Sequence, residues 1–186
     1  AYARSTLHRT EDEKMAVIIQ QLSGGRYGDY FYPPLSGVAQ SYNFYPISHM
    51  KPEEGIAHIA LGLGKTVVEG GTSLRFSPKY PQFLPQFSTV DDILKNSQRF
   101  FYALKMVNWS KQFESQDKTK DDATLTKLEI DDAYDHAPVI NLSSTYIPDE
   151  NRIRDTGNVT GFPVLTFASI LKYDFFPLPQ KAFYMF

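Results

Sequence analysis

Apolar residues occur along this chain in short runs that are separated by Gly, Pro and charged residues. Short apolar runs with turn residues on both sides, several of them alternating with polar positions, are typical of strands. We expect strands over residues 15–22, 36–45, 56–61, 66–69, 124–130, 139–142 and 164–167. Because several connections are short and contain Gly or Pro, neighbouring strands should run antiparallel.

One stretch has the spacing of a helix. Its apolar residues, which recur every three or four positions, are Ile93, Leu94, Phe100, Phe101, Leu104 and Val107. Ser88 or Thr89 fits the N-cap position, and Asp91 and Asp92 follow in the first turn, where the helix dipole favours carboxylates. We therefore expect one helix that extends to about Trp109.

Together these elements predict an α+β fold, which is mainly an antiparallel sheet with few helices. A chain of 186 residues is long enough to bury a substantial core. The polar, charged stretch 112–122 has the composition of a linker. We expect a first lobe over residues 1–110 and a strand-rich extension over residues 123–186 that packs on it.

Composition narrows the function classes. The chain is 42% hydrophobic and 15% aromatic, which favours a folded domain over a disordered one. Its net charge is −2 and its Lys and Arg are dispersed, so we expect no nucleic-acid partner. The absence of Cys excludes disulfides and thiolate metal sites. The longest apolar run, near residues 164–171, is too short to span a bilayer, so we expect no membrane partner and a cytoplasmic location.

Residues 54–77 carry the most informative pattern. An apolar run leads into Gly62-Leu63-Gly64, and Lys65, an apolar pair and a Gly pair follow before a second apolar segment that contains Arg75. Glycine removes the Cβ atom and permits positive φ, so this layout suits a turn whose backbone comes close to another group. We expect the turn at the open, ligand-facing edge of the sheet.

This segment resembles part of the ATP-binding domain of the phosphoenolpyruvate synthase and pyruvate phosphate dikinase family. That family has Gly-Leu-Gly-Glu, an apolar pair and Gly, with a second acidic residue further along. Three upstream segments follow the family's order: a Tyr-Arg pair at 2–4, a Val-Gln strand at 16–22 and a Ser-Gly-Val strand at 35–39. One difference is that Lys65 and, allowing a one-residue gap, Arg75 stand at the family's acidic positions.

The resemblance implies that the first lobe is ATP-grasp-like and belongs to the later half of an ATP-binding domain. ATP is then the expected ligand, and its phosphoryl group would pass through a histidine on another domain to pyruvate. The implied nucleotide-binding residues are Gln20 and Gln21, near the adenine, and Gly62, Gly64, Lys65 and Arg75, near the phosphates. Because Lys and Arg cannot coordinate magnesium, we expect no metal site in this part of the protein and little magnesium binding without nucleotide.

Two hypotheses about function remain open. The first is an active phosphotransferase, and the retained glycines and strand order favour it. The second is a module that keeps the fold for binding or structure but has lost catalysis, which Lys65 and Arg75 favour. A Gly-x-Gly turn is also a common fold device, so its spacing alone does not establish nucleotide contact. The chain starts without Met and ends on apolar residues, so we expect it to be a piece of a longer polypeptide. We expect this piece to be inactive alone. Its expected partners are the nucleotide and the other domains of the same polypeptide.

Other candidate residues have simpler explanations. We expect His49 in a loop and His58 in the core. Residues 131–136 contain several carboxylates and a His, which suit either a cation site or a solvated turn. The aromatic-rich region suggests packing in a sheet core, with stacking on an adenine or sugar as the alternative. Its members are Tyr27, Tyr30, Phe31, Tyr32, Tyr42, Phe44 and Tyr45.

Overall fold

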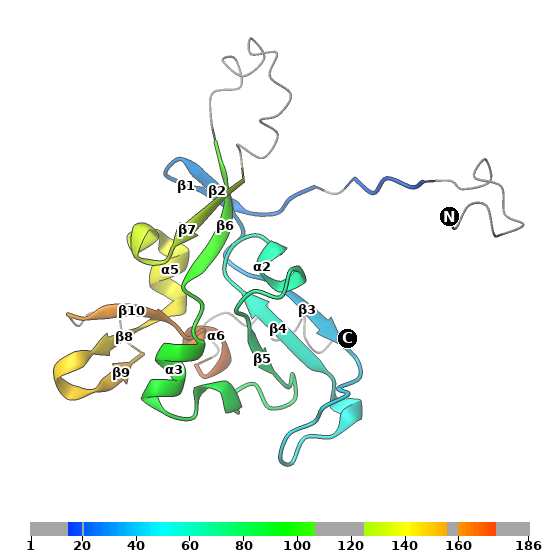
Figure 1. The fold of residues 1–186 in the computed structure, drawn as a ribbon, viewed down its shortest axis with the longest axis vertical. Helices are drawn as coiled ribbons and strands as arrows, with labels where there is room; N and C mark the ends of the chain where they lie inside the picture. Colours follow the sequence, from blue (N-terminus) through cyan, green and yellow to red (C-terminus); the bar gives the residue numbers. More distant parts are fainter. Residues whose placement is uncertain (1–14, 20, 107–124, 156–159, 174–186) are drawn as a thin grey trace, which may run out of the picture.

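The fold is α+β, with few helices and mainly antiparallel sheets, which confirms the expected fold class (Figure 1). The computed structural model describes residues 15–19, 21–106, 125–155 and 160–173. The helices in this part of the chain are α2 (Lys65–Val68), α3 (Val90–Asn96), α5 (Ala137–Leu142) and α6 (Ala168–Leu171), with single 3-10 turns at Pro52–Glu54, Pro85–Phe87, Asp131–Ala133 and Pro148–Glu150. None of the described helices is long and apolar enough to cross a membrane.

The largest sheet has the strand order β1–β2–β6–β7, and all its neighbouring strands are antiparallel. Its strands are β1 (Gly25–Tyr27), β2 (Tyr30–Tyr32), β6 (Phe100–Lys105) and β7 (Leu125–Glu129). β7 confirms the strand expected near residues 124–130. Because β6 and β7 pair along five residues, one sheet contains residues from both expected lobes. The division into 1–110 and 123–186 stays a prediction.

The second sheet has the order β3–β4–β5 and carries the glycine turn after its central strand. Its strands are β3 (Ser36–Gln40), β4 (Ile56–Ala60) and β5 (Leu74–Phe76). Ala57 and Ile59 point from β4 into the core, and Leu74 and Phe76 do so from β5. The alternation along these strands therefore buries one face of the sheet and leaves the other accessible.

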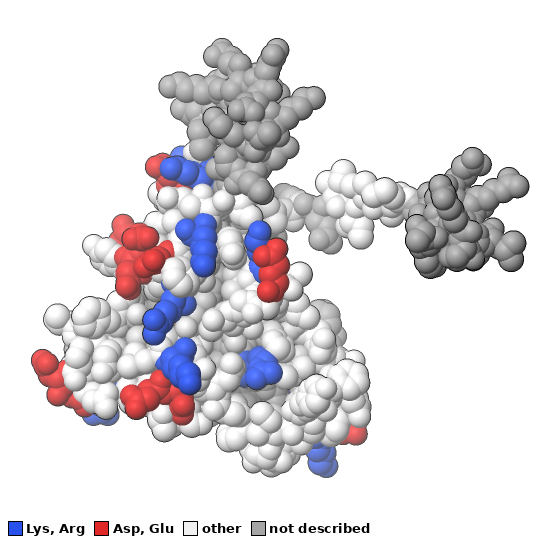
Figure 2. Space-filling model, viewed as in Figure 1, with Lys and Arg blue, Asp and Glu red and all other residues white. Residues whose placement is uncertain are grey.

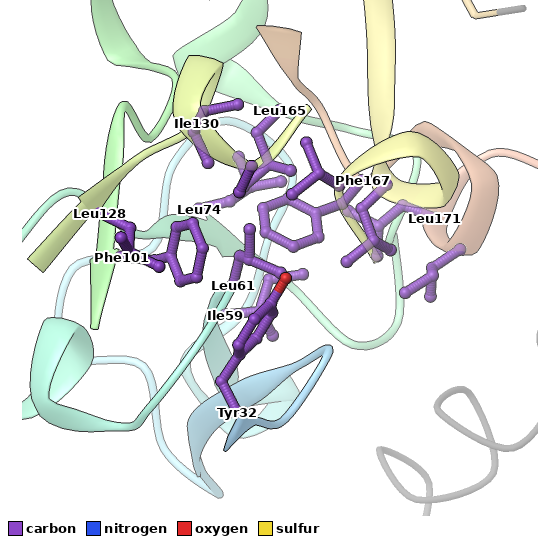
Figure 3. Packing of buried hydrophobic residues seen from close by; sticks show 14 of the residues in the cluster. Tyr32, Ile59, Leu61, Leu74, Phe101, Leu128, Ile130, Leu165, Phe167 and Leu171 are labelled. Carbon is purple, nitrogen blue, oxygen red and sulfur yellow. The ribbon is translucent and has the colours of Figure 1, made fainter. Parts of the chain in front are cut away.

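A third sheet, of order β10–β8–β9, forms the other side of the molecule with α5 and α6. Its strands are β8 (Ser143–Ile147), β9 (Arg152–Arg154) and β10 (Phe162–Leu165). Side chains from all three sheets meet in one apolar core, part of which is drawn in Figure 3. Tyr32 and Phe101 come from the first sheet, Ile59 from the second and Leu165 from the third, and all are almost fully buried. Burial of this shared core is the main force that holds the sheets together.

Three sequence predictions about single elements were wrong. The expected helix ends at Asn96, and the residues after it form β6, because Phe101 and Ala103 alternate inward and the strand pairs on both sides. Residues 66–69 belong largely to the short helix α2 instead of a strand. Residues 139–142 lie in helix α5, whose first turn accommodates Pro138 because that position needs no backbone N–H.

Other element boundaries also differ from expectation. Residues 15–19 and 21–24 are extended but belong to no sheet, so the strand expected at 15–22 is wrong for the described residues. The strand expected at 36–45 ends at Gln40, and the last expected strand covers Phe162–Leu165 instead of 164–167. Thr89 is the N-cap of α3, since its hydroxyl accepts a hydrogen bond from the Asp92 N–H (3.1 Å). Of the two expected N-cap residues, Ser88 and Thr89, the structure thus has the second.

Candidate functional site

A cavity of about 310 Å³ lies beside the glycine turn, between α2, the end of α3 and the β6–β7 pair. We call it the Lys65 cavity. Among the residues that the structure describes, its basic lining residues are Lys65, Lys95, Arg99 and Lys127, and its one acidic lining residue is Glu69. Figure 2 shows Lys and Arg side chains over α2, α3 and the β6–β7 pair on one face of the molecule. Such a grouping of cations around a concave site raises the local concentration of anions.

The glycine turn positions Lys65 because its backbone packs directly against β6. The Leu63 N–H donates a hydrogen bond to the Tyr102 carbonyl oxygen (2.8 Å). Gly62 has φ of +84°, and a Cβ atom there would lie 2.7 Å from the same oxygen. Gly62 and Leu63 are therefore buried, so the expectation of an open turn is wrong for them. The chain reaches the surface at Gly64, where a Cβ would meet nothing within 4 Å, and α2 starts at Lys65.

Lys65 has two neighbours that hold its side chain at the cavity. Its Nζ lies 3.5 Å from Glu69 Oε1, one helical turn away, and 5.2 Å from the centroid of the Tyr102 ring. The side chains of Lys65 and Glu69 are 34% and 60% exposed, so water weakens this ion pair. Glu69 and Tyr102 thus orient the Lys65 ammonium group, and its charge stays available because the ion pair is open to water.

β6 and β7 supply a second basic group over an aromatic surface. Tyr102 and Lys127 are directly opposite each other in the antiparallel pair, and Phe100 lies two residues before Tyr102 on the same face. Lys127 Nζ lies 4.2 Å from the centroid of the Phe100 ring. Cation–π contacts of this kind orient an ammonium group while leaving its other donors available.

The end of α3 contributes the remaining cations. Lys95 is in the last turn of the helix, where the helix dipole favours positive charge. Arg99 follows the helix, and its guanidinium donates to the Leu94 carbonyl oxygen (3.3 Å). Between them, Ser97 also lines the cavity. In the described part of the chain, four cations from α2, the end of α3 and β7 therefore face one carboxylate, which gives this lining an excess of positive charge.

The structure separates the residues that the sequence placed near phosphates. Lys65 lines the cavity and Gly62 and Gly64 form the turn that leads to it, whereas Arg75 on β5 lines a different cavity. Gln21 is exposed and lines neither of these cavities, and Gln20 lies outside the described residues. The sequence prediction did not include Lys95, Arg99 or Lys127. These three residues reach Lys65 through the β6–β7 register and the early end of α3, and no short sequence motif predicts either feature.

Arg75 lies beside His58 on the outer face of the second sheet. The two residues are directly paired between β4 and β5, and both line a cavity of about 350 Å³ that we call the Arg75 cavity. His58 is half-buried on this outer face, so its expected place in the core is wrong. Burial, and then the charge of Arg75, lower the pKa of His58, which favours the neutral imidazole.

Residues 131–136 form a 3-10 turn that leads into α5, and the ring of His136 packs against Tyr27 and Tyr32 of the first sheet. His136 Nδ1 lies 2.7 Å from the hydroxyl of Tyr32 on β2. Burial is the main reason that the pKa of Tyr32 is raised. Within the described residues, no group of three or more His, Cys, Asp or Glu is placed to hold a metal ion.

Comparisons of this chain with protein-family models, with curated proteins and with solved structures found no match.

Proposed function

We propose that this chain is part of the ATP-binding domain of a phosphotransferase that resembles phosphoenolpyruvate synthase, and that the Lys65 cavity receives the nucleotide's phosphates. The observation that carries the proposal is the convergence of Lys65, Lys95, Arg99 and Lys127 on one cavity beside the Gly-Leu-Gly turn. Phosphoryl transfer depends chiefly on positioned positive charge around the phosphates. The cavity supplies that charge at the point in the chain where the resemblance expects phosphate contact.

The lining of the cavity fits a nucleotide better than an isolated metal ion. Lys and Arg are donors to phosphate oxygens, and the Phe100 and Tyr102 rings add apolar surface for a base or sugar. Glu69 is the one carboxylate that the described residues bring to the lining, and it already lies beside Lys65. A hard divalent cation needs several oxygen ligands. Magnesium would therefore arrive with the nucleotide and take most of its ligands from phosphate oxygens and water.

The second hypothesis, a binding or structural module without catalysis, is favoured by the Lys65–Glu69 contact. In the family that the sequence resembles, an acidic residue stands where Lys65 stands here. A lysine that forms an ion pair with a glutamate of its own helix can stabilise that helix without binding a substrate. The two hypotheses agree that the cavity attracts anions and differ in whether the parent protein transfers a phosphoryl group.

Exposed apolar residues support the proposal that other domains of the same polypeptide are partners. Met15, Val17, Ile18 and Ile19 are each more than 80% exposed in an extended segment that leaves the body of the molecule. Consecutive exposed apolar residues of this kind mark interaction surfaces. Their extended backbone suits pairing with a strand of a neighbouring domain.

Removing positive charge from the Lys65 cavity should weaken nucleotide binding. We expect the Lys65→Gln/Lys127→Gln double variant to bind ATP, titrated without magnesium by calorimetry, at least about tenfold more weakly than the parent chain, because each lysine contributes a charge-assisted contact. Lys79→Gln is the matched control, because Lys79 pairs with Glu54 at 2.7 Å and does not line the cavity. Equal weakening by the control, or no change in the double variant, would contradict the proposal.

The chain by itself should not turn over ATP. A nucleotide held by one lobe lacks the positioning across a cleft that supplies most of the rate, and the acceptor histidine is expected on another domain. Incubation of the purified chain with ATP, magnesium and pyruvate should produce no more phosphate or nucleotide product than a heat-treated sample. Pyruvate-dependent consumption of ATP above that control would show that the chain is a complete catalyst.

A further inference from the structure

The outer face of the second sheet contributes two polar side chains to the Arg75 cavity. His58 and Arg75 lie side by side there, because the register pairs them directly between β4 and β5. Among the residues that the structure describes, Arg75 belongs to no ion pair. A guanidinium group is always charged and presents five donors, so this one remains available to an anion.

A loop with exposed aromatic rings forms the wall of the cavity. Phe44 and Tyr45 are 73% and 87% exposed, yet both line it. Asn43 anchors the loop: it is almost fully buried, its N–H donates to the Pro52 carbonyl oxygen (2.7 Å), and its Oδ1 accepts from the Tyr45 N–H (3.1 Å). The sequence predicted core packing for these rings, which is wrong for Phe44 and Tyr45. Rings that an anchored loop holds beside a cavity can stack on a planar ligand.

One buried polar atom in the cavity has no partner among the residues that the structure describes. Ser77 is 1% exposed and lines the cavity, and its Oγ makes no hydrogen bond within this part of the chain. An unpaired buried hydroxyl is costly, and a bound molecule, an ion or water is one of the explanations for such a group. It is an observation independent of Arg75 and of the aromatic wall, and it also indicates a ligand with a polar group.

We propose that the Arg75 cavity binds a small aromatic carboxylate. Arg75 would hold the carboxylate, and the rings of Phe44 and Tyr45 would cover the planar body. Neutral His58 and the Ser77 hydroxyl would hydrogen-bond a polar substituent at the other end. The volume of about 350 Å³ is in the lower range of small-molecule sites, which suits a single-ring compound. This site is separate from the Lys65 cavity, and it does not depend on nucleotide binding there.

The test uses 4-hydroxybenzoate as the probe and 4-hydroxybenzamide as its neutral counterpart, titrated into the parent chain by NMR. We expect saturable amide shifts at His58, Arg75 and Ser77, with a dissociation constant of about 1 mM or lower. The benzamide should bind at least about tenfold more weakly, because it cannot form the charge-assisted pair with Arg75. This comparison needs no altered protein, so it does not depend on the folding of a variant.

Two variants then assign the contacts. Arg75→Gln should weaken 4-hydroxybenzoate binding about tenfold and remove the preference over the benzamide. Arg99→Gln, in the Lys65 cavity, should leave binding unchanged. Absence of saturation at about 10 mM, equal affinity for both probes, or shifts confined to the Lys65 cavity would overturn the proposal. Since ATP binding is measured separately, failure here leaves the proposed function standing, and the reverse also holds.

Discussion

Replacing Gly62 by Ala should lower the free energy of unfolding by about 3 kcal/mol, one of the two largest effects expected of a single substitution in this protein. The φ of +84° is strained for any residue with a Cβ atom. The new methyl group would also lie 2.7 Å from the Tyr102 carbonyl oxygen and 2.8 Å from the Phe101 ring. Neither neighbour can move easily, because Phe101 is fully buried and β6 is paired on both sides. Urea denaturation followed by circular dichroism gives the difference directly.

Gly64→Ala is the matched control for this substitution. Gly64 has helical backbone angles, and nothing lies within 4 Å of a Cβ placed there. The alanine should be neutral or stabilise the fold by up to about 1 kcal/mol, because it restricts the unfolded chain. If both variants lose similar stability, the turn does not pack against β6 as described.

Gln98→Leu should cost a comparable amount, about 3 kcal/mol, through hydrogen bonds instead of sterics. The Gln98 side chain is almost fully buried between Leu61, which follows β4, and Phe100, which begins β6. Its Oε1 accepts from the Leu61 N–H (2.8 Å), and its Nε2 donates to the carbonyl oxygens of Leu61 (3.0 Å) and Phe100 (2.8 Å). Leucine has similar size but leaves the buried backbone groups of Leu61 without these partners, and each such loss is expensive.

Gln86→Leu provides the comparison for Gln98. Gln86 makes the same kind of bridge, accepting from the Arg75 N–H (2.7 Å) and donating to the Ser73 carbonyl oxygen (3.5 Å). Its bond to Arg75 is exposed, so water can replace the lost partner, and we expect a cost of about 1 kcal/mol or less. A cost at Gln98 no larger than at Gln86 would mean that the Gln98 bridge adds little to the link between the two sheets.

The fold class was predictable from the sequence because short apolar runs bounded by turn residues leave few alternatives to strands. Individual elements were less predictable where one stretch satisfies two periodicities. Residues 100–105 continue the helical spacing of α3, but their buried and accessible side chains also alternate as in a strand. They form a strand because they pair with β2 on one side and β7 on the other. Residues 139–142 are apolar enough for a strand, and Pro138 was the available signal for a helix start.

The candidate site was only partly predictable for a related reason. The glycine pattern identified Lys65, because a local motif describes a local turn. Lys127 stands far along the chain and reaches the cavity only through its register opposite Tyr102. Arg75 was grouped with Lys65 by resemblance, whereas strand β5 directs it to the cavity beside His58. Contacts that depend on register and on the end of a helix are tertiary information that one sequence does not display.

Mapping ATP onto the chain by NMR is the most direct test of phosphate binding in the Lys65 cavity. We expect ATP, added without magnesium, to shift the amides of residues 63–72, 97–102 and 127 in a saturable way and to leave those around Arg75 unchanged. Added magnesium should keep the same set of shifted residues, because the cation would enter with the phosphates. Saturable shifts located elsewhere on the described chain, or none at concentrations where the nucleotide is in large excess, would contradict the assignment of the Lys65 cavity as a phosphate site.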